Sequence, residues 1–211
     1  MTAAKTKGPW VVKLGGSLAA SAALLPWLAA LGGIEVPLAI VPGGGPFADR
    51  VRDMQSTWGF DESAAHAMAL LSMEQLGLML ASLEPRLRPC IDLQDFSDSF
   101  ESRRPALWLP GVMTLEADDI EESWDVTSDS LAAWLAGRLG ARGLVLVKSA
   151  EPPAGTADAA TLARRGLVDG AFARHLADSG VDCWCVGADG PELFAAALAR
   201  NLPPGCRVHP C

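Results

Sequence analysis

The segment from Val11 to Ser17, VVKLGGS, places a glycine-rich turn directly after an apolar run. A second segment of this kind, AIVPGGGP, runs from Ala39 to Pro46. Glycine lets the backbone approach an anion and turn its N–H groups inward, and a helix that begins just afterwards adds the positive end of its dipole. The two segments therefore predict two strand-to-helix turns, each suited to holding a phosphate group.

Strands and helices are expected to alternate along the rest of the chain. Apolar runs predict strands at 10–14, 35–41, 88–93, 106–109, 144–148 and 183–186, with a further edge strand at 206–209. Helical patterns cover 17–31, with an interruption or kink near Pro26, and 46–57, 62–83, a segment from Thr127, 157–165, 171–179 and 191–200. The acidic, serine-rich stretch before 106–109 is left open as a helix or a loop. The alternation predicts an α/β fold, a three-layer αβα sandwich with a mainly parallel central sheet.

Composition limits the organisation and the partners of the chain. With 211 residues, half of them hydrophobic, residues 1–211 are expected to form one domain, with 1–9 as a flexible leader. A net charge of -8 argues against nucleic-acid binding. The first nine residues contain no apolar signal core, and no stretch approaches the roughly 18 apolar residues of a membrane span. We therefore expect a cytoplasmic protein that binds small molecules and neither nucleic acid nor membrane.

Lysine is scarce in this chain, and its positions are informative. Lys5 and Lys7 lie in the polar leader, whereas Lys13 and Lys148 stand at the ends of apolar runs. The carboxyl ends of parallel strands are where open α/β sheets bind ligands. Lys13 and Lys148 are thus candidate ligand-binding cations, although Lys148 is also compatible with a solvated strand end.

Three motifs, in this order, resemble those of the amino acid kinase superfamily. KLGGS at 13–17 is similar to its first glycine loop, PGGG at 42–45 to its second, and TSDSLA at 127–132 to the start of its catalytic-aspartate helix. The short length and the segments VPGGGPFAD at 41–49, AHAMAL at 65–70 and WDVTSD at 124–129 look most like one branch. That branch phosphorylates an aminomethylfuran phosphate in methanofuran-type cofactor synthesis.

The resemblance implies an ATP-dependent kinase with Mg²⁺ bound to ATP and no metal site made by protein side chains alone. Lys13 would contact the phosphoryl group in flight, and Asp129 would orient Lys13 or the metal–nucleotide. The residues implied to hold the ATP phosphates are Gly15, Gly16 and Ser17, and those implied to hold the acceptor are Gly43, Gly44 and Gly45. A phosphate acceptor has no hydroxyl to deprotonate, so a general base is not required. The superfamily usually forms dimers, so a homo-oligomer is also expected.

The sequence departs from the superfamily pattern on the nucleotide side. Many relatives have an Asp-x-Asp-Gly turn after the strand that ends here at Lys148, but this chain reads SAEPP at 149–153. No lysine follows Lys148, so a second phosphate-binding lysine is missing. Lys148 itself, or an arginine such as Arg164 or Arg165, would have to supply that charge.

Other residue types leave alternatives open. Asp129 is also suited to be only a helix N-cap. His66 is either a packing histidine or part of the acceptor site. Cys206, His209 and Cys211 resemble metal ligands by type, but their spacing matches no complete zinc set. The cationic amine of the favoured acceptor needs an acidic partner, for which Asp49, Glu62 and Glu74 are candidates.

Two other functions are compatible with the sequence. The acceptor of the kinase is alternatively a small carboxylate or another phosphate monoester. A protein of this fold that keeps its glycine loops without turnover would instead bind or store a nucleotide or an oxyanion. Retention of both Lys13 and Asp129 argues for the enzyme, because binding alone does not require the pair.

Overall fold

A computed structural model describes residues 8–201 and 203–210 of the chain. One eight-stranded sheet crosses this part of the chain in the order β3-β4-β2-β1-β5-β7-β8-β6. Its strands are β1 Trp10–Leu14, β2 Leu38–Pro42, β3 Arg88–Cys90, β4 Ala106–Trp108, β5 Gly143–Val147, β6 Thr156–Asp158, β7 Cys183–Val186 and β8 Cys206–His209. Neighbouring strands run parallel except β7 and β8, which are antiparallel. The mainly parallel α/β sheet is therefore confirmed.

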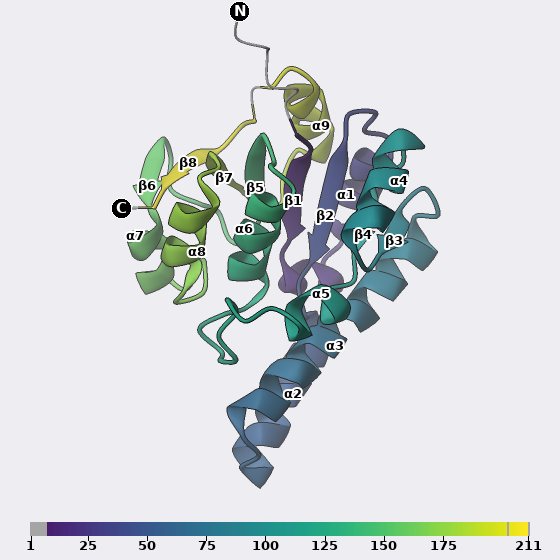
Figure 1. Ribbon diagram of the computed structural model, residues 1–211. Coiled ribbons are helices and arrows are strands. Elements are labelled where there is room, and N and C mark those ends of the chain that lie inside the picture. The colour runs from purple at the N-terminus through teal and green to yellow at the C-terminus, as the bar shows by residue number, and fades with distance from the viewer. Residues whose placement is uncertain (1–7, 202, 211) are drawn as a thin grey trace, which may run out of the picture.

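Helices cover both faces of the sheet, as Figure 1 shows. They are α1 Leu24–Gly32, α2 Gly45–Trp58, α3 Glu62–Leu83, α4 Leu93–Glu101, α5 Gly111–Leu115, α6 Ser128–Arg138, α7 Ala159–Arg164, α8 Phe172–Ser179 and α9 Pro191–Ala199. Helices α6 and α8 lie on one face, and α1 and α9 lie on the other. The pair α2 and α3 projects beyond the carboxyl ends of β1 and β2.

The central strands are buried on both faces, which is why they read as uninterrupted apolar runs. Val11 and Leu144 belong to the core beneath α6, whereas Val12 and Val145 belong to the core beneath α1. Successive side chains of a strand point to opposite faces, so one apolar run supplies both layers. The expected three-layer sandwich follows from this alternation.

The helix expected at 17–31 is divided into two parts. A 3-10 helix, η1, spans Gly16–Ala20, and α1 begins at Leu24. Pro26 lies in the first turn of α1, where its missing N–H leaves no helical hydrogen bond unmade. The interruption therefore precedes Pro26, and α1 itself contains no proline-induced break.

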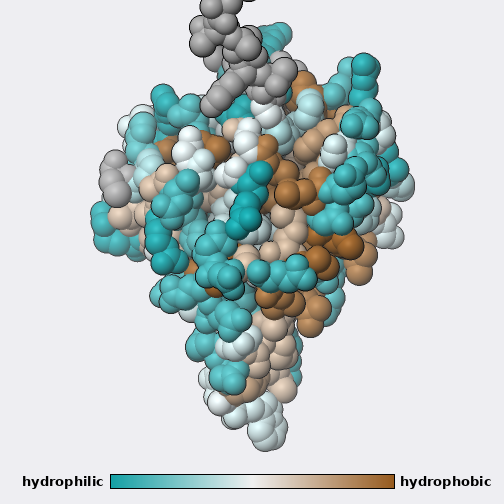
Figure 2. All heavy atoms as spheres, viewed as in Figure 1, coloured by the Kyte–Doolittle hydropathy of each residue, from teal (hydrophilic) through white to brown (hydrophobic). Residues whose placement is uncertain are grey.

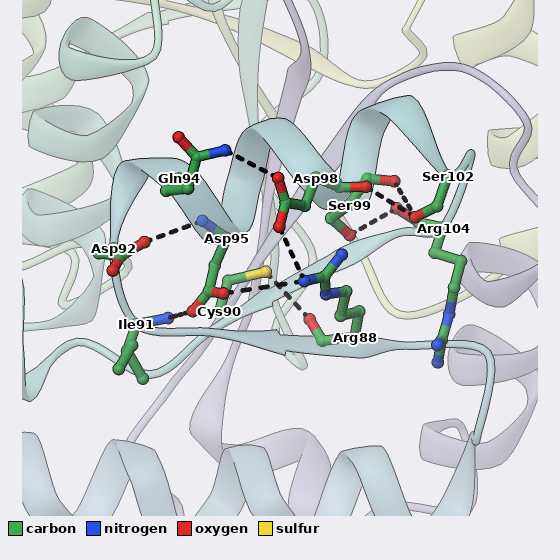
Figure 3. A network of polar contacts seen from close by, with 10 residues as sticks. All are labelled: Arg88, Cys90, Ile91, Asp92, Gln94, Asp95, Asp98, Ser99, Ser102 and Arg104. Carbon is green, nitrogen blue, oxygen red and sulfur yellow. Dashed lines mark hydrogen bonds and ion pairs between the residues drawn. The ribbon is translucent and has the colours of Figure 1, made fainter.

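The acidic stretch before β4 is a helix, α4. Its first turn is capped by Asp92, whose Oδ1 accepts a hydrogen bond of 2.8 Å from the amide of Asp95. The guanidinium of Arg88 on β3 pairs with Asp98 at 3.3 Å, which holds α4 against the sheet (Figure 3). A cap and a cross-element ion pair thus stabilise a helix that the local sequence left undecided.

The C-terminal part of the sheet differs from the expectation. Thr156–Asp158 forms β6, where the sequence predicted the start of a helix, and α7 begins only at Ala159. Strand β6 pairs with β8, so β8 lies inside the sheet and β6 forms its edge. The three residues of β6 have no apolar alternation, and only pairing with distant residues 207–209 makes them a strand.

The long helix α3 begins where the sequence placed it, with the Oδ1 of Asp61 accepting a 2.8 Å hydrogen bond from Ala64 N. Its length and composition alone would let it cross a membrane, but 44% of its most apolar window is buried inside the protein. It packs against α2 and β2, as a core helix does. Leu71 and Leu78 remain exposed on it, and apolar side chains gather beside α3 and α5 (Figure 2).

Candidate active site

Lys13, Asp129 and Lys148 meet in one buried cluster at the carboxyl ends of β1 and β5. The Nζ atom of Lys13 lies 2.9 Å from Oδ1 of Asp129. The Nζ atom of Lys148 donates to both carboxylate oxygens, at 2.6 and 2.7 Å. The side chain of Lys148 is therefore directed inward, so the solvated alternative for it is wrong.

Parallel pairing explains how the two lysines meet. Strands β1 and β5 are neighbours in register, with Leu14 opposite Val147, and Gly15 N donates to Val147 O at 2.9 Å. Lys13 lies just before the end of β1, and Lys148 follows the last residue of β5. Helix α6 starts next to this edge of the sheet and places Asp129 between the two lysines.

Burial and charge set the protonation of the cluster. Burial lowers the pKa of Lys13 from 10.5 to about 8, although the charge of Asp129 opposes this. Burial also works to raise the pKa of Asp129, but Lys13 and Lys148 outweigh it and lower that pKa to about 2. For Lys148, burial is outweighed by Asp129, and its pKa is raised. At neutral pH the cluster thus holds two cations around one carboxylate.

The N-cap alternative for Asp129 is wrong. The N-cap of α6 is Thr127, and Asp129 lies inside the first turn with its side chain on the lysines. A second carboxylate, Asp169, receives hydrogen bonds from Thr127 and Ser130. Sequence reasoning missed Asp169, which lies about forty residues further along the chain.

The two glycine loops touch each other. A Cβ on Gly16 would lie 2.4 Å from Gly45 N, and a Cβ on Gly43 would lie 2.4 Å from Gly16 N. Gly45 also has a φ of +54°, which disfavours a side chain. No side chain of residues 8–201 or 203–210 caps the first turn of η1 or of α2, so the amides there have no side-chain acceptor in this part of the chain.

A cavity of about 430 Å³ opens beside the loops, between α2, α3 and residues 123–128. Gly16, Ser17, Gly44 and Gly45 line it, whereas Gly15 and Gly43 are buried behind. His66 of α3 also lines the cavity and is 6% exposed. Burial lowers the pKa of His66, so it is neutral at pH 7. The structure therefore brings His66 to the cavity that the second glycine loop borders.

Arg52 and Trp124 complete the wall of the cavity, and sequence reasoning had assigned neither of them a role. The guanidinium of Arg52 lies 4.3 Å from the ring centroid of Trp124, whose Nε1 donates to Gln55 Oε1 at 2.7 Å. Arg52 follows Gly45 by two helical turns on α2, and Asp49, which also lines the cavity, lies between them. That helical spacing is the signal from which Arg52 was predictable.

The sequence model described as "Amino acid kinase family" matches residues 8–151. This range contains both glycine loops, Asp129 and Lys148. The chain belongs to the amino acid kinase family. The predicted resemblance to that family is confirmed.

One curated member of the amino acid kinase family is 31% identical over 140 residues. It is the 5-(aminomethyl)furan-3-ylmethyl phosphate kinase of Methanocaldococcus jannaschii, and the matched region spans 64% of this chain and 63% of that protein. This relative belongs to the branch that the motifs indicated.

Solved structures of the family share the fold. The uridylate kinase of Archaeoglobus fulgidus has a TM-score of 0.72 at 16% identity, with 95% of this chain and 99% of that chain covered. The UMP kinase of Bacillus anthracis has a TM-score of 0.68 at 14% identity, with 96% of each chain covered. An isopentenyl phosphate kinase has a TM-score of 0.61 at 16% identity, with 95% and 99% covered. These similarities establish the amino acid kinase fold.

The segment after Lys148, where the sequence departs from the expected family pattern, packs against the first glycine loop and the turn after β7. Ser149, after Lys148, lies within hydrogen-bond distance of Ser17, with 2.8 Å between their Oγ atoms. Glu151 packs on Gly187, where a Cβ would lie 2.2 Å from Glu151 Oε2. Of the cations that the sequence offered for the missing charge, Arg164 donates to Thr161 Oγ1 of its own helix, whereas Lys148 joins Lys13 at Asp129.

The terminal cysteine and histidine residues form no site in the described part of the chain. Cys206 is buried on β8 and His209 is exposed, so the two side chains point to opposite faces of the strand. Cys211 lies outside the described residues. Within residues 8–201 and 203–210, no three His, Cys, Asp or Glu side chains come together as metal ligands.

Proposed function

We propose that this protein is an ATP-dependent kinase whose acceptor is a small phosphate monoester. The observation that carries the proposal is the Lys13–Asp129–Lys148 cluster at the foot of two touching glycine loops. Phosphoryl transfer requires two anionic groups to be positioned and their charge to be neutralised in the transition state. The loops supply backbone amides for two phosphates, and the cluster supplies the cations.

Each part of the site then has a role. Gly16 and Ser17 bind the ATP phosphates, and Gly15, whose amide already donates to Val147 O, shapes the turn behind them. Lys13 and Lys148 stabilise the charge on the transferred group. Asp129 holds the two ammonium groups at a fixed separation and keeps both charged. Because its carboxylate already accepts from both lysines, we assign it no role as a general base.

The magnesium ion would arrive with ATP. Mg²⁺ usually keeps several waters and binds substrate phosphates with one or two protein carboxylates at most. The amides at the start of η1 and α2 would hold the ATP phosphates, and the ion would be bound through those phosphates. The ion supplies charge neutralisation on the ATP oxygens.

The acceptor is proposed to be 5-(aminomethyl)furan-3-ylmethyl phosphate, converted to its diphosphate. Its phosphate would bind the start of α2 at Gly44 and Gly45, with Arg52 as a counter-cation. The furan ring would lie against Trp124 and the apolar wall formed by Leu70 and Met73. These features support a flat, anionic acceptor of a size that the cavity accommodates.

Asp49 is the proposed partner for the acceptor's ammonium group. It is the acidic side chain among the described residues that line the cavity. Glu62 instead accepts a hydrogen bond from Gln55, and Glu74 accepts one from the amide of Gly111. The structure therefore favours Asp49 over the other two carboxylates that the sequence nominated.

Phosphorus NMR with Mg-ATP and this acceptor tests the proposal. A new diphosphate signal, lost in Lys13→Met and kept in Arg50→Met, is the expected result. Arg50 is an exposed cation of α2 that pairs with Asp53, so it controls for the loss of a positive charge. ADP formation without that signal would support the kinase activity but would show that the acceptor is a different molecule. Nucleotide binding without any ADP formation would overturn the proposed kinase activity and indicate a nucleotide-binding protein instead.

A further inference from the structure

Helix α6 begins with a cap from a distant segment. Its N-cap residue, Thr127, makes no capping hydrogen bond with its own side chain. Instead, Oδ2 of Asp169 accepts from the amide of Thr127 at 3.0 Å, its hydroxyl at 2.8 Å and the amide of Ser130 at 3.0 Å. Oδ1 of Asp169 accepts from the hydroxyl of Ser130. One carboxylate thus satisfies four donors around the first turn.

The turn that Asp169 holds carries Asp129 between Thr127 and Ser130. A second tie lies alongside, where the amide of Ala171 donates to Asp125 O at 2.8 Å. Gly170 between them has no room for a side chain, since a Cβ there would lie 2.8 Å from Asp125 Oδ1. Residues 169–171 therefore contact residues 125–130 at both ends of the turn and hold it in place.

We propose that Asp169 is a positioning residue, which fixes the first turn of α6 and so holds the Asp129 carboxylate between Lys13 and Lys148. Among the described residues, Asp169 makes no hydrogen bond or ion pair with either lysine, and its charge is the last of the effects that set the pKa of Lys13. Its direct bonds go to Thr127 and Ser130 on either side of Asp129, so its main effect passes through that turn. Displacement of a catalytic group by about 1 Å is enough to lower the reaction rate by about 100-fold. Anchoring this turn is thus worth more to turnover than an ordinary helix cap.

A carboxylate suits this position for an electrostatic reason. The N-terminus of a helix favours a negative charge, and the amides there donate hydrogen bonds to Asp169. Burial and the charge of Asp129 raise the pKa of Asp169, and the hydrogen bonds from Ser130 and Thr127 oppose that rise. Asn at this position keeps an acceptor for the amides, so Asp169→Asn is the conservative variant and Asp169→Ala the disruptive one.

Asp158 provides a matched control. It caps α7 through the same chemistry, accepting from the amide of Thr161 at 2.7 Å and from its hydroxyl at 2.8 Å. Its helix carries none of the clustered residues. Asp158→Ala should therefore cost stability without changing turnover, which separates loss of a cap from loss of position.

The test measures kcat and the KM values for ATP and acceptor in the full chain, below the unfolding transition of each variant. Asp169→Ala should lower kcat at least tenfold with KM for ATP within threefold, and Asp169→Asn should restore kcat to within threefold. Ser130→Ala, which removes one donor, should lower kcat less and give a non-additive double mutant with Asp169→Asn. It also provides the test should Asp169→Ala fail to fold.

A crystal structure of Asp169→Ala, or of Ser130→Ala together with Asp169→Asn, gives a readout that is independent of activity. The expected result is loss of at least one contact from Asp129 to Lys13 or Lys148. Unchanged contacts together with a kcat like that of Asp158→Ala would overturn the proposal. Only the kinetic readout rests on the proposed function. If the wild-type protein transfers no phosphoryl group, that function is refuted, and the crystal structure of the variant still decides the role of Asp169.

Discussion

Lys148 donates to both carboxylate oxygens of Asp129, which lies nineteen residues earlier in the chain. One residue follows the last position of β5 and the other lies in the first turn of α6, the helix that leads into that strand. Lys13 reaches the same carboxylate from β1. Two buried cations therefore form their ion pairs with the same carboxylate, and the consequences of this can be measured.

Asp129→Asn should destabilise the fold as well as abolish transfer. Removing the carboxylate leaves Lys13 and Lys148 buried without a counter-charge, a change that typically costs about 3 kcal/mol in free energy of unfolding. Urea denaturation at pH 7 measures this loss. Asp182→Asn, which breaks the exposed pair with Arg207, should cost less than about 1 kcal/mol. Equal losses in the two variants would contradict the burial argument.

ATP binding should take up a proton at alkaline pH. The pKa of Lys13 is lowered to about 8 in the free protein, so above that pH its ammonium is largely deprotonated. Phosphate oxygens favour the charged form, so binding raises this pKa and the affinity for ATP falls as the pH increases beyond 8. Calorimetry at pH 8.5 in buffers of different ionisation enthalpy measures the uptake. Lys13→Arg, which stays charged, should show none, and an identical uptake in that variant would assign the proton elsewhere.

Gly16→Ala should separate the two phosphate loops. The added Cβ would lie 2.4 Å from the amide nitrogen of Gly45, which is backbone and has little room to yield. We expect kcat/KM to fall by about 100-fold, since both phosphates lose their alignment. Gly33→Ala is the control, because its Cβ would meet only ordinary contacts at 3.5 Å and beyond. Wild-type kinetics in Gly16→Ala would show that the loops tolerate separation.

Arg52→Leu should weaken binding of the acceptor without weakening binding of ATP. The guanidinium lines the cavity and stacks on Trp124, so its removal takes away the cation proposed to face the acceptor's phosphate. The KM for the acceptor should increase about tenfold or more, the value of one charge-assisted contact. Arg50→Leu, two residues earlier and exposed, should leave both KM values unchanged. An increase in the KM for ATP alone would place Arg52 on the nucleotide side.

Much of the fold was predictable because its signals are local. The buried central strands read as continuous apolar runs, and the helical pattern bounded α3 correctly at Glu62 and Leu83. Strand β6 was missed because its three residues become a strand only by pairing with β8. Helix α4 was undecided because Arg88 and the Asp92 cap act from outside its apolar pattern.

The sequence by itself determined the two glycine turns, the mainly parallel character of the sheet and the lysines at the ends of its strands, because turn chemistry and apolar periodicity are local properties of the sequence. Only the tertiary structure decided that Lys148 faces inward, that Asp129 compensates two cations and does not cap its helix, and that Asp169 supplies that cap. It also brought Arg52, Trp124 and His66 to one cavity. These facts depend on distances between segments that are remote in the chain, and on the burial that makes each unpaired charge costly.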